Sequence, residues 1–132
     1  VRILAPAATY QPGPLASNDD SLVMHLRYEK TSALLEGDAE APIEEQMLAT
    51  EPLAAGLLKV GHHGSSTSTI PPFLAAVHPQ FAVISVGRHN PFGHPRVSVL
   101  DELQGAHVRV YRTDTLGLSS FLLNGTSIQP TR

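Results

Sequence analysis

Cysteine is absent from the 132-residue chain. Disulfide bonds, zinc–thiolate sites and thiol catalysis are therefore excluded, and the redox compartment stays open. Positive charge is also scarce, because 9 lysines and arginines face 12 acidic residues, giving a net charge of −3. A broad basic surface for nucleic acid is not expected, since such surfaces neutralise phosphates with lysine and arginine. Cleavage of a phosphodiester is still compatible with this charge, because bound metal ions can supply positive charge locally.

Long apolar runs and targeting signals are missing as well. No apolar stretch reaches the roughly 18 residues of a membrane span. The start at Val1 lacks the charged-then-apolar layout of a signal peptide, and it lacks an initiator methionine. We therefore expect the chain to begin after processing or inside a longer protein.

What is present indicates one packed domain over residues 1–132. Hydrophobic residues make up 42% of the chain and charged residues 16%, which favours a core over disorder. Apolar periodicity predicts three helices among eight strands, with a hairpin turn at Asn124-Gly125. This order predicts an α/β (α+β) fold, a mixed sheet with flanking helices. The predicted strands are 1–5, 21–28, 32–37, 57–61, 81–87, 108–112, 117–123 and 127–129, and the predicted helices are 39–50, 71–78 and 96–104.

Two predicted strands end in side chains that bind metals. Residues 57–61 form an apolar run that stops at His62 and His63, and residues 32–37 stop at Asp38. Neighbouring strands of one sheet would bring these ends together at the edge where α/β folds bind ligands. A carboxylate and imidazoles together suit a borderline metal ion such as zinc. A third strand end, after residues 81–87, leads into a loop that holds His94.

Each of these residues also has an ordinary structural interpretation. Asp38 precedes a predicted helix and is a preferred N-cap residue. A His-His pair in a loop is commonly surface, and His94 could cap or pack the helix that follows it. The hydroxyl-rich residues 65–69 lack a nucleophile elbow, so we interpret them as a turn and reject a serine hydrolase.

Taken together, five segments resemble the metallo-β-lactamase-type domain of the ComEC family, the bacterial competence DNA-uptake channel. They recur in the family's order and cover nearly the whole chain. One ends in Gly37-Asp38, one contains His62-His63-Gly64, and one contains His89-Asn90-Pro91-Phe92-Gly93-His94-Pro95. The matching segments are residues 18–23, 35–38, 58–65, 85–95 and 110–114.

The resemblance implies an αββα sandwich that holds two metal ions, usually zinc. Asp38 would bridge the two metals, and the family's last histidine ligand maps onto His62, with His63 as the second choice. The family's opening His-x-His-x-Asp-His motif is absent from this chain; in the family it lies upstream of the matching region. The chain therefore resembles the C-terminal part of that domain, and we expect it to bind zinc weakly or not at all by itself.

The resemblance also implies roles and partners. His63 and His94 would contact the phosphate or protonate the leaving oxygen, and Asn18, Ser21 and Asn90 would contact the substrate. The substrate would be DNA or another phosphoester, cut by a domain of a membrane channel protein that lies outside the cytoplasmic membrane. Losing half of the domain would expose apolar faces, so we expect a homodimer or other self-association.

Two other functions stay open at this stage. The missing ligands favour a non-catalytic module that supports fold or assembly within the channel, whereas the retained Asp38 and His62 favour an active parent domain. A different enzyme of the same fold, such as a phosphorylcholine esterase or a lactonase, would use the same ligands.

Overall fold

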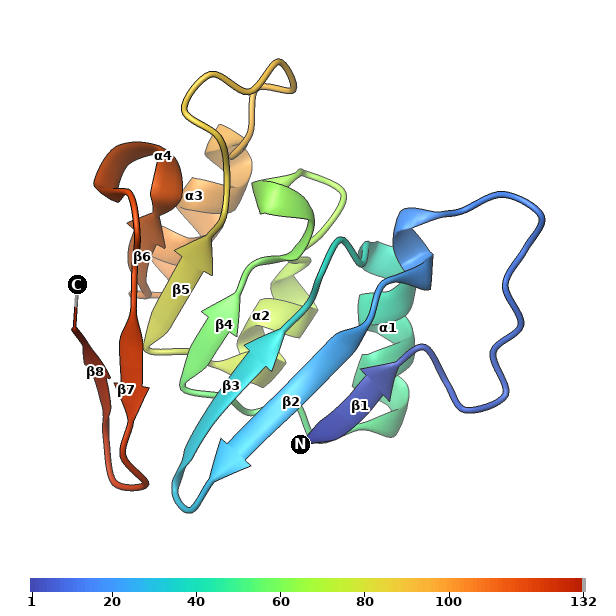
Figure 1. Ribbon diagram of the computed structural model, residues 1–132, viewed down its shortest axis with the longest axis horizontal. Helices are drawn as coiled ribbons and strands as arrows, with labels where there is room; N and C mark the ends of the chain where they lie inside the picture. The colour runs from blue at the N-terminus through green and yellow to red at the C-terminus, as the bar shows by residue number, and fades with distance from the viewer. Residues whose placement is uncertain (132) are drawn as a thin grey trace.

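A computed structural model describes residues 1–131. Its main feature is a sheet of six strands in the order β1-β2-β3-β4-β5-β6 (Figure 1). Strands β1 to β3 are antiparallel neighbours, and β3 to β6 are parallel. The predicted mixed sheet is therefore confirmed. The strands are β1 (Arg2–Ala5), β2 (Val23–Tyr28), β3 (Thr31–Leu35), β4 (Leu57–Lys59), β5 (Phe81–Ile84) and β6 (Arg109–Arg112).

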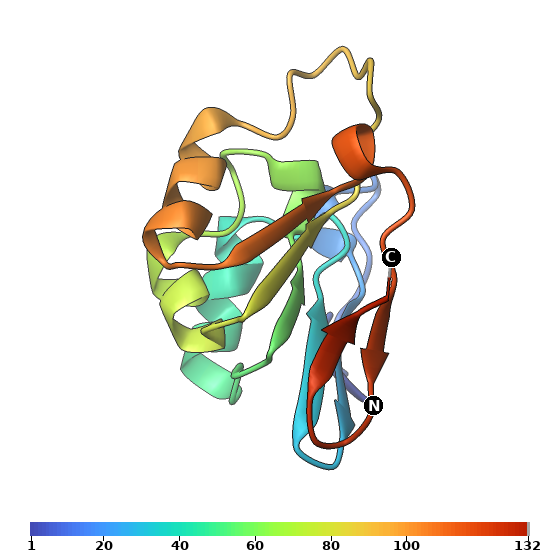
Figure 2. The same ribbon diagram turned by 90° about the vertical axis from the view of Figure 1, so that its left-hand side faces the viewer.

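Helices α1 (Ala41–Thr50), α2 (Pro71–Val77) and α3 (Val97–Gly105) connect the parallel strands and lie on one face of the sheet (Figure 2). Each helix joins two neighbouring parallel strands, because parallel strands need a crossover connection. Side chains that alternate along the strands pack against these helices and form the main core. Its largest fully buried members are Phe73, Leu34, Met47, Leu58, Ile84 and Leu103.

The opposite face of the sheet is only partly covered. A hairpin of β7 (Phe121–Leu123) and β8 (Ile128–Pro130) packs over β4, β5 and β6 through a second, smaller core around Phe81. This hairpin confirms the turn predicted at Asn124-Gly125.

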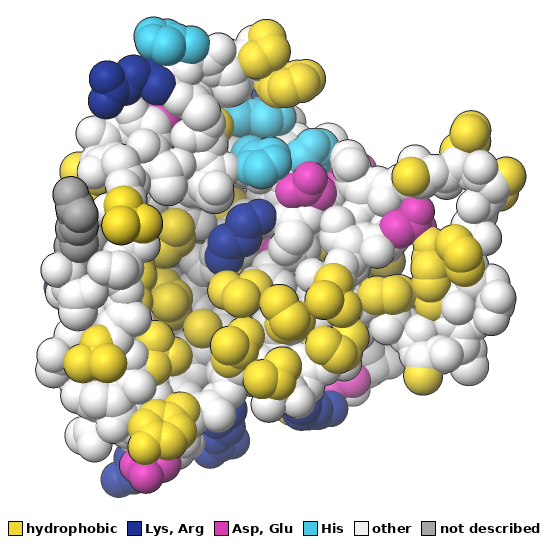
Figure 3. All heavy atoms as spheres, viewed as in Figure 1, with side chains coloured by type: hydrophobic (Ala, Val, Ile, Leu, Met, Phe, Trp, Pro, Cys, Tyr) yellow, Lys and Arg dark blue, Asp and Glu magenta, His cyan; other side chains and the backbone are white. Residues whose placement is uncertain are grey.

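Beyond the hairpin, the face formed by β1, β2 and β3 carries apolar side chains that no other element of residues 1–131 covers. Register places Ile3 beside Met24 and Met24 beside Leu35, so these three point the same way. Ile3 is 52% exposed, and apolar side chains gather in the centre of this face (Figure 3). Helices thus cover one face of the sheet, whereas the β1–β3 part of the other face is an exposed apolar surface.

Some predicted details are wrong. Gly105 was expected just beyond the end of its helix, but it is the last residue of α3, and Ala106 is the C-cap. The predicted strand at 117–123 begins at Phe121, because residues 113–116 form a short helix, α4 (Thr113–Leu116), whose positive-φ C-cap residue Gly117 follows. Between residues 1 and 131, no helix has the length and apolarity needed to cross a bilayer.

Candidate functional site

The C-terminal ends of the parallel strands meet at one edge of the sheet, as the sequence predicted. Asp38 follows β3, and His62 and His63 lie in a short 3-10 segment, η2 (Gly61–Gly64), directly after β4. The loop after β5 carries His94. Figure 3 shows histidine side chains beside acidic ones at this edge. Three adjacent strands, β3, β4 and β5, thus deliver imidazoles and a carboxylate to one place.

Asp38 contacts His63. Its Oδ1 lies 3.5 Å from Nε2 of His63, and both side chains are about half exposed. The other ring nitrogen, Nδ1, lies 2.6 Å from the carbonyl oxygen of Ser85. Because a carbonyl only accepts, Nδ1 carries a proton, and in the tautomer with that single proton Nε2 holds the lone pair. His63 therefore presents a metal-binding atom next to a carboxylate.

His62 is fixed in the same way by a different partner. Its Nδ1 lies 2.8 Å from Oε1 of Glu40, and Thr67 donates its hydroxyl to the same oxygen at 2.7 Å. The hydrogen bond from Thr67 is the main cause that lowers the pKa of Glu40, with Asn18 and His62 adding to it. Glu40 is therefore ionised and accepts a hydrogen bond from Nδ1–H of His62, and in that tautomer the lone pair of His62 is on Nε2.

The two histidines share an uncommon backbone. Both adopt positive φ, 42° at His62 and 56° at His63. Gly64 follows with φ 81°, and a Cβ there would lie 2.6 Å from Pro95, so only glycine fits. Left-handed backbone at consecutive non-glycine residues is costly and is kept where surrounding structure fixes it.

A buried pair of carboxyl groups provides part of that support. Glu36 and Glu44 are both fully buried. Glu36 accepts the N–H of Gly61 at 2.9 Å, and Glu44 accepts the N–H groups of Thr69 and Ile70. Burial, and then the charge of Glu44, raises the pKa of Glu36 well above its usual range. We conclude that Glu36 is the protonated member, since Glu44 already accepts two backbone N–H groups.

His94 lies on the other side of His62, with their ring centroids 5.7 Å apart. Burial lowers its pKa, and Arg96, His62 and His63 lower it further. Its Nδ1 is buried without a hydrogen-bond partner within residues 1–131. The ring is therefore neutral, and a proton on Nε2 avoids leaving a buried N–H unpaired.

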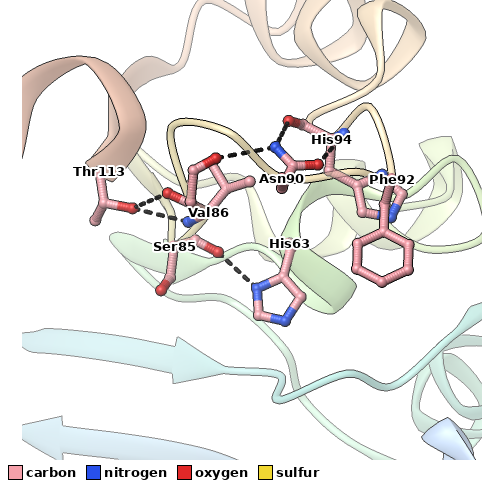
Figure 4. Close-up of a pocket in the computed structure, with 8 residues that line it drawn as sticks. His63, Ser85, Val86, Asn90, Phe92, His94 and Thr113 are labelled. Atoms are coloured by element: carbon pink, nitrogen blue, oxygen red, sulfur yellow. Dashed lines mark hydrogen bonds between the residues drawn. The ribbon is translucent and has the colours of Figure 1, made fainter.

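A cavity of about 450 Å³ opens beside these rings (Figure 4). Its walls come from η2, from the loop after β5 and from the start of α4. His63, Asn90, Phe92, His94 and Thr113 are among its lining residues. This is within the volume range of small-ligand sites.

The three predicted substrate contacts all have partners inside the protein. Ser21 Oγ accepts the backbone N–H of Asp38 at 3.0 Å, and Asn18 donates to Glu40 at 3.3 Å. The amide of Asn90 donates to the carbonyls of Gly87 and His94 and accepts the N–H of His94. These contacts favour a positioning role, although Asn90 also lines the cavity.

Sequence reasoning missed Glu40, Glu36 and Glu44. Glu40, rather than Asp38, is the N-cap residue of α1, although its side chain makes no cap hydrogen bond. An acidic residue at a helix start gives no local sign that it binds an imidazole. Glu36 lies between an apolar run and Gly37, and that burial signal could have been noticed.

The fold and this edge define a mixed α/β domain that presents histidines and carboxylates at the end of a parallel half-sheet.

No protein-family model matches the chain. It is 40% identical over 87% of its length to ComE operon protein 3 of Bacillus subtilis. It is 42% identical over 77% to Recombination protein 2 of Haemophilus influenzae, and 32% identical over 87% to Competence protein ComA of Neisseria gonorrhoeae.

These alignments show homology to a segment of those proteins. The chain spans only 15%, 13% and 17% of their lengths, respectively.

Proposed function

We propose that this chain is the C-terminal part of a metallo-β-lactamase-type domain that hydrolyses phosphodiesters in a competence protein. The observation that carries the proposal is the pair of fixed imidazoles. His62 and His63 each hold a proton at Nδ1, through Glu40 and the Ser85 carbonyl, and each presents the Nε2 lone pair at the edge that holds Asp38. Oriented imidazoles backed by a carboxylate or carbonyl are the usual histidine ligands of metals.

The histidine and aspartate side chains at this edge are of the types that bind zinc, but they are too few to hold an ion by themselves. Imidazole nitrogen and carboxylate oxygen are both zinc ligands. Among residues 1–131, however, no three histidine, aspartate or glutamate side chains converge closely enough to hold an ion by themselves. We therefore propose that a His-x-His-x-Asp-His motif in a longer protein completes a two-zinc site. Asp38 would bridge the ions, and His62 or His63 would be a terminal ligand.

Bound zinc would supply a hydroxide at neutral pH and stabilise charge on the phosphate. The residues of this chain prepare the site for that chemistry. Asp38 is oriented by the Ser21 hydroxyl, which accepts its backbone N–H. Neutral His94 can donate Nε2–H to a phosphate oxygen, because burial disfavours its charged form. This favours phosphate binding by His94 over the proton transfer that we also considered.

The open sheet face supports the same assignment. Ile3, Met24 and Leu35 form part of an apolar surface on the side opposite the helices. An exposed apolar sheet face usually has a partner. A second sheet from the longer protein would cover it and complete an αββα sandwich.

The similarity to ComA and to ComE operon protein 3 supports a role in competence, with DNA as the phosphodiester. We propose that the longer protein is a membrane channel and that this domain lies outside the cytoplasmic membrane. One strand of incoming DNA would be its substrate.

Hydrolysis by the longer protein tests the proposal. With zinc present, it should cleave single-stranded oligodeoxynucleotides, and Asp38→Ala should abolish cleavage. Asp101→Ala, an exposed aspartate on α3, is the matched control and should retain full activity. Wild-type protein that binds zinc without hydrolysis would indicate a non-catalytic module instead. Cleavage of other phosphoesters or of lactones in place of DNA would indicate another enzyme of the fold.

A further inference from the structure

Phe92 is an aromatic side chain that lines the cavity and yet is largely exposed to solvent. Phe92 is 68% exposed and lies within the loop that connects β5 to α3. It lines the same cavity as His63 and His94 (Figure 4). An exposed phenylalanine at the rim of a polar site offers an aromatic surface to a ligand.

The ring is held rather than free. It stacks on the imidazole of His94, with centroids 6.0 Å apart and planes 17° from parallel. Asn90 fastens the loop through three hydrogen bonds, two to the carbonyls of Gly87 and His94 and one from the N–H of His94. Gly93 provides a positive-φ turn between the two rings, with φ 68°. One face of Phe92 is therefore supported from within, and a flat partner can stack on the exposed part of the ring.

The surroundings suit a nucleotide. Arg88 and His89 are exposed on the same loop, within four positions of Phe92. His63 and His94 line the cavity wall beside the ring. A strand bound through phosphate contacts at these cationic and imidazole groups would pass beside Phe92, which shares their loop and cavity. Stacking of bases on aromatic side chains, with basic groups along the backbone, is the usual mode of single-strand binding.

We infer that Phe92 is a base-stacking residue, which makes the site prefer phosphodiesters that carry an unpaired nucleobase next to the bound phosphate. This inference rests on the proposed function. It adds the residue that would distinguish a nucleotide chain from a simple phosphoester, because a phosphate contact alone cannot do so.

The absence of tryptophan from this chain provides a direct probe. Phe92→Trp introduces a single indole at the proposed stacking position. Oligodeoxythymidylate should quench its fluorescence, whereas an abasic oligomer of equal length should not. No quenching by oligodeoxythymidylate up to millimolar concentration would overturn the inference, and so would equal quenching by the two oligomers.

Affinity provides the second readout, measured as the anisotropy of end-labelled oligomers. Phe92→Ala should weaken binding of oligodeoxythymidylate about tenfold, given the usual strength of base–aromatic stacking. Binding of the abasic oligomer should not change. Tyr28→Ala is the matched control, because Tyr28 is 57% exposed at the far end of β2 and should leave both affinities unchanged. Equal weakening of both oligomers by Phe92→Ala would contradict stacking.

These outcomes separate the inference from the proposed function. Base-dependent quenching in a protein whose complete domain does not hydrolyse phosphodiesters would remove the enzymatic proposal and keep stacking. Hydrolysis at equal rates with and without bases, together with no quenching, would remove base stacking by Phe92 and keep the enzymatic proposal.

Discussion

Nε2 of His63 lies 3.5 Å from Oδ1 of Asp38, so the ends of β3 and β4 meet through these two side chains. The backbone carbonyl of Ser85 fixes the His63 ring from the other side, at 2.6 Å. Three adjacent strand ends thus define one orientation for this imidazole. Because Nε2 then holds the lone pair, His63 stands with His62 as a candidate metal ligand.

The first prediction concerns His63 itself. His63→Asn should lower zinc affinity and phosphodiesterase activity of the longer protein by at least about tenfold, as loss of an oriented ligand does. Asparagine is the suitable substitute, because it tolerates the positive φ of this position. His78→Asn is the matched control, since His78 also has positive φ but lies at the C-cap of α2. Equal activity in the two variants would exclude His63 from the site.

The second prediction concerns Glu40, which orients His62. Glu40→Gln should weaken zinc binding about 10–100-fold, because a neutral amide is a poorer acceptor for the Nδ1 proton. Calorimetric titration of the longer protein with zinc measures the change. Glu45→Gln, an exposed neighbour on α1, should leave the affinity unaltered. An unchanged affinity in Glu40→Gln would show that His62 is not a ligand.

The third prediction concerns the buried carboxyl pair. Burial raises the folded-state pKa of Glu36 above its ordinary value of 4.5. Folding therefore takes up a proton above about pH 4.5, and the stability from Glu36 falls by about 1.4 kcal/mol per pH unit until the folded pKa is reached. Glu36→Gln should remove this slope, because the amide does not titrate and its oxygen still accepts the N–H of Gly61. Denaturant unfolding between pH 5 and pH 8 measures the slope, and an unchanged slope in Glu36→Gln would refute the assignment.

Glu44→Gln is the reciprocal variant. The N–H groups of Thr69 and Ile70 now bind different carboxylate oxygens, so the amide N–H₂ of the variant would face one of them while its oxygen accepts the other. We expect it to cost about 1–3 kcal/mol at all pH values, since a buried donor loses its acceptor. Equal stability of the two glutamine variants would mean that Glu36 does not carry the shared proton.

The fourth prediction concerns the open apolar face. Leu26 points to the same side as Met24, and the chain alone should self-associate through this surface. Leu26→Lys should shift sedimentation toward the monomer. Leu122→Lys, at a 51% exposed position on the hairpin, is the matched control and should not. A wild-type chain that sediments as a single monomeric species would contradict this prediction.

The sequence was sufficient to predict the strand ends, because apolar runs that stop at Gly37-Asp38 and at His62-His63 are local signals. The partners across the site were not predictable in the same way. Asp38 meets His63 rather than the first choice, His62, because two consecutive positive-φ residues set where each ring points. Nothing local in the sequence specifies that backbone.

The buried acids show the same limit. Glu36 directly follows β3 and Glu44 lies in α1, and their shared burial depends on how α1 packs against the sheet. Their role appears only when the loops that bind them, at Gly61 and at Thr69-Ile70, are in place. Burial of a charge-bearing side chain is a tertiary property, and composition alone cannot reveal it.

Calorimetric titration of the longer protein with zinc, comparing wild type with Asp38→Ala, tests the central claim most directly. We expect the wild type to take up two zinc ions per chain and Asp38→Ala to lose this uptake, while Asp101→Ala behaves as wild type. Undiminished zinc uptake by Asp38→Ala would contradict a metal site at this edge of the sheet.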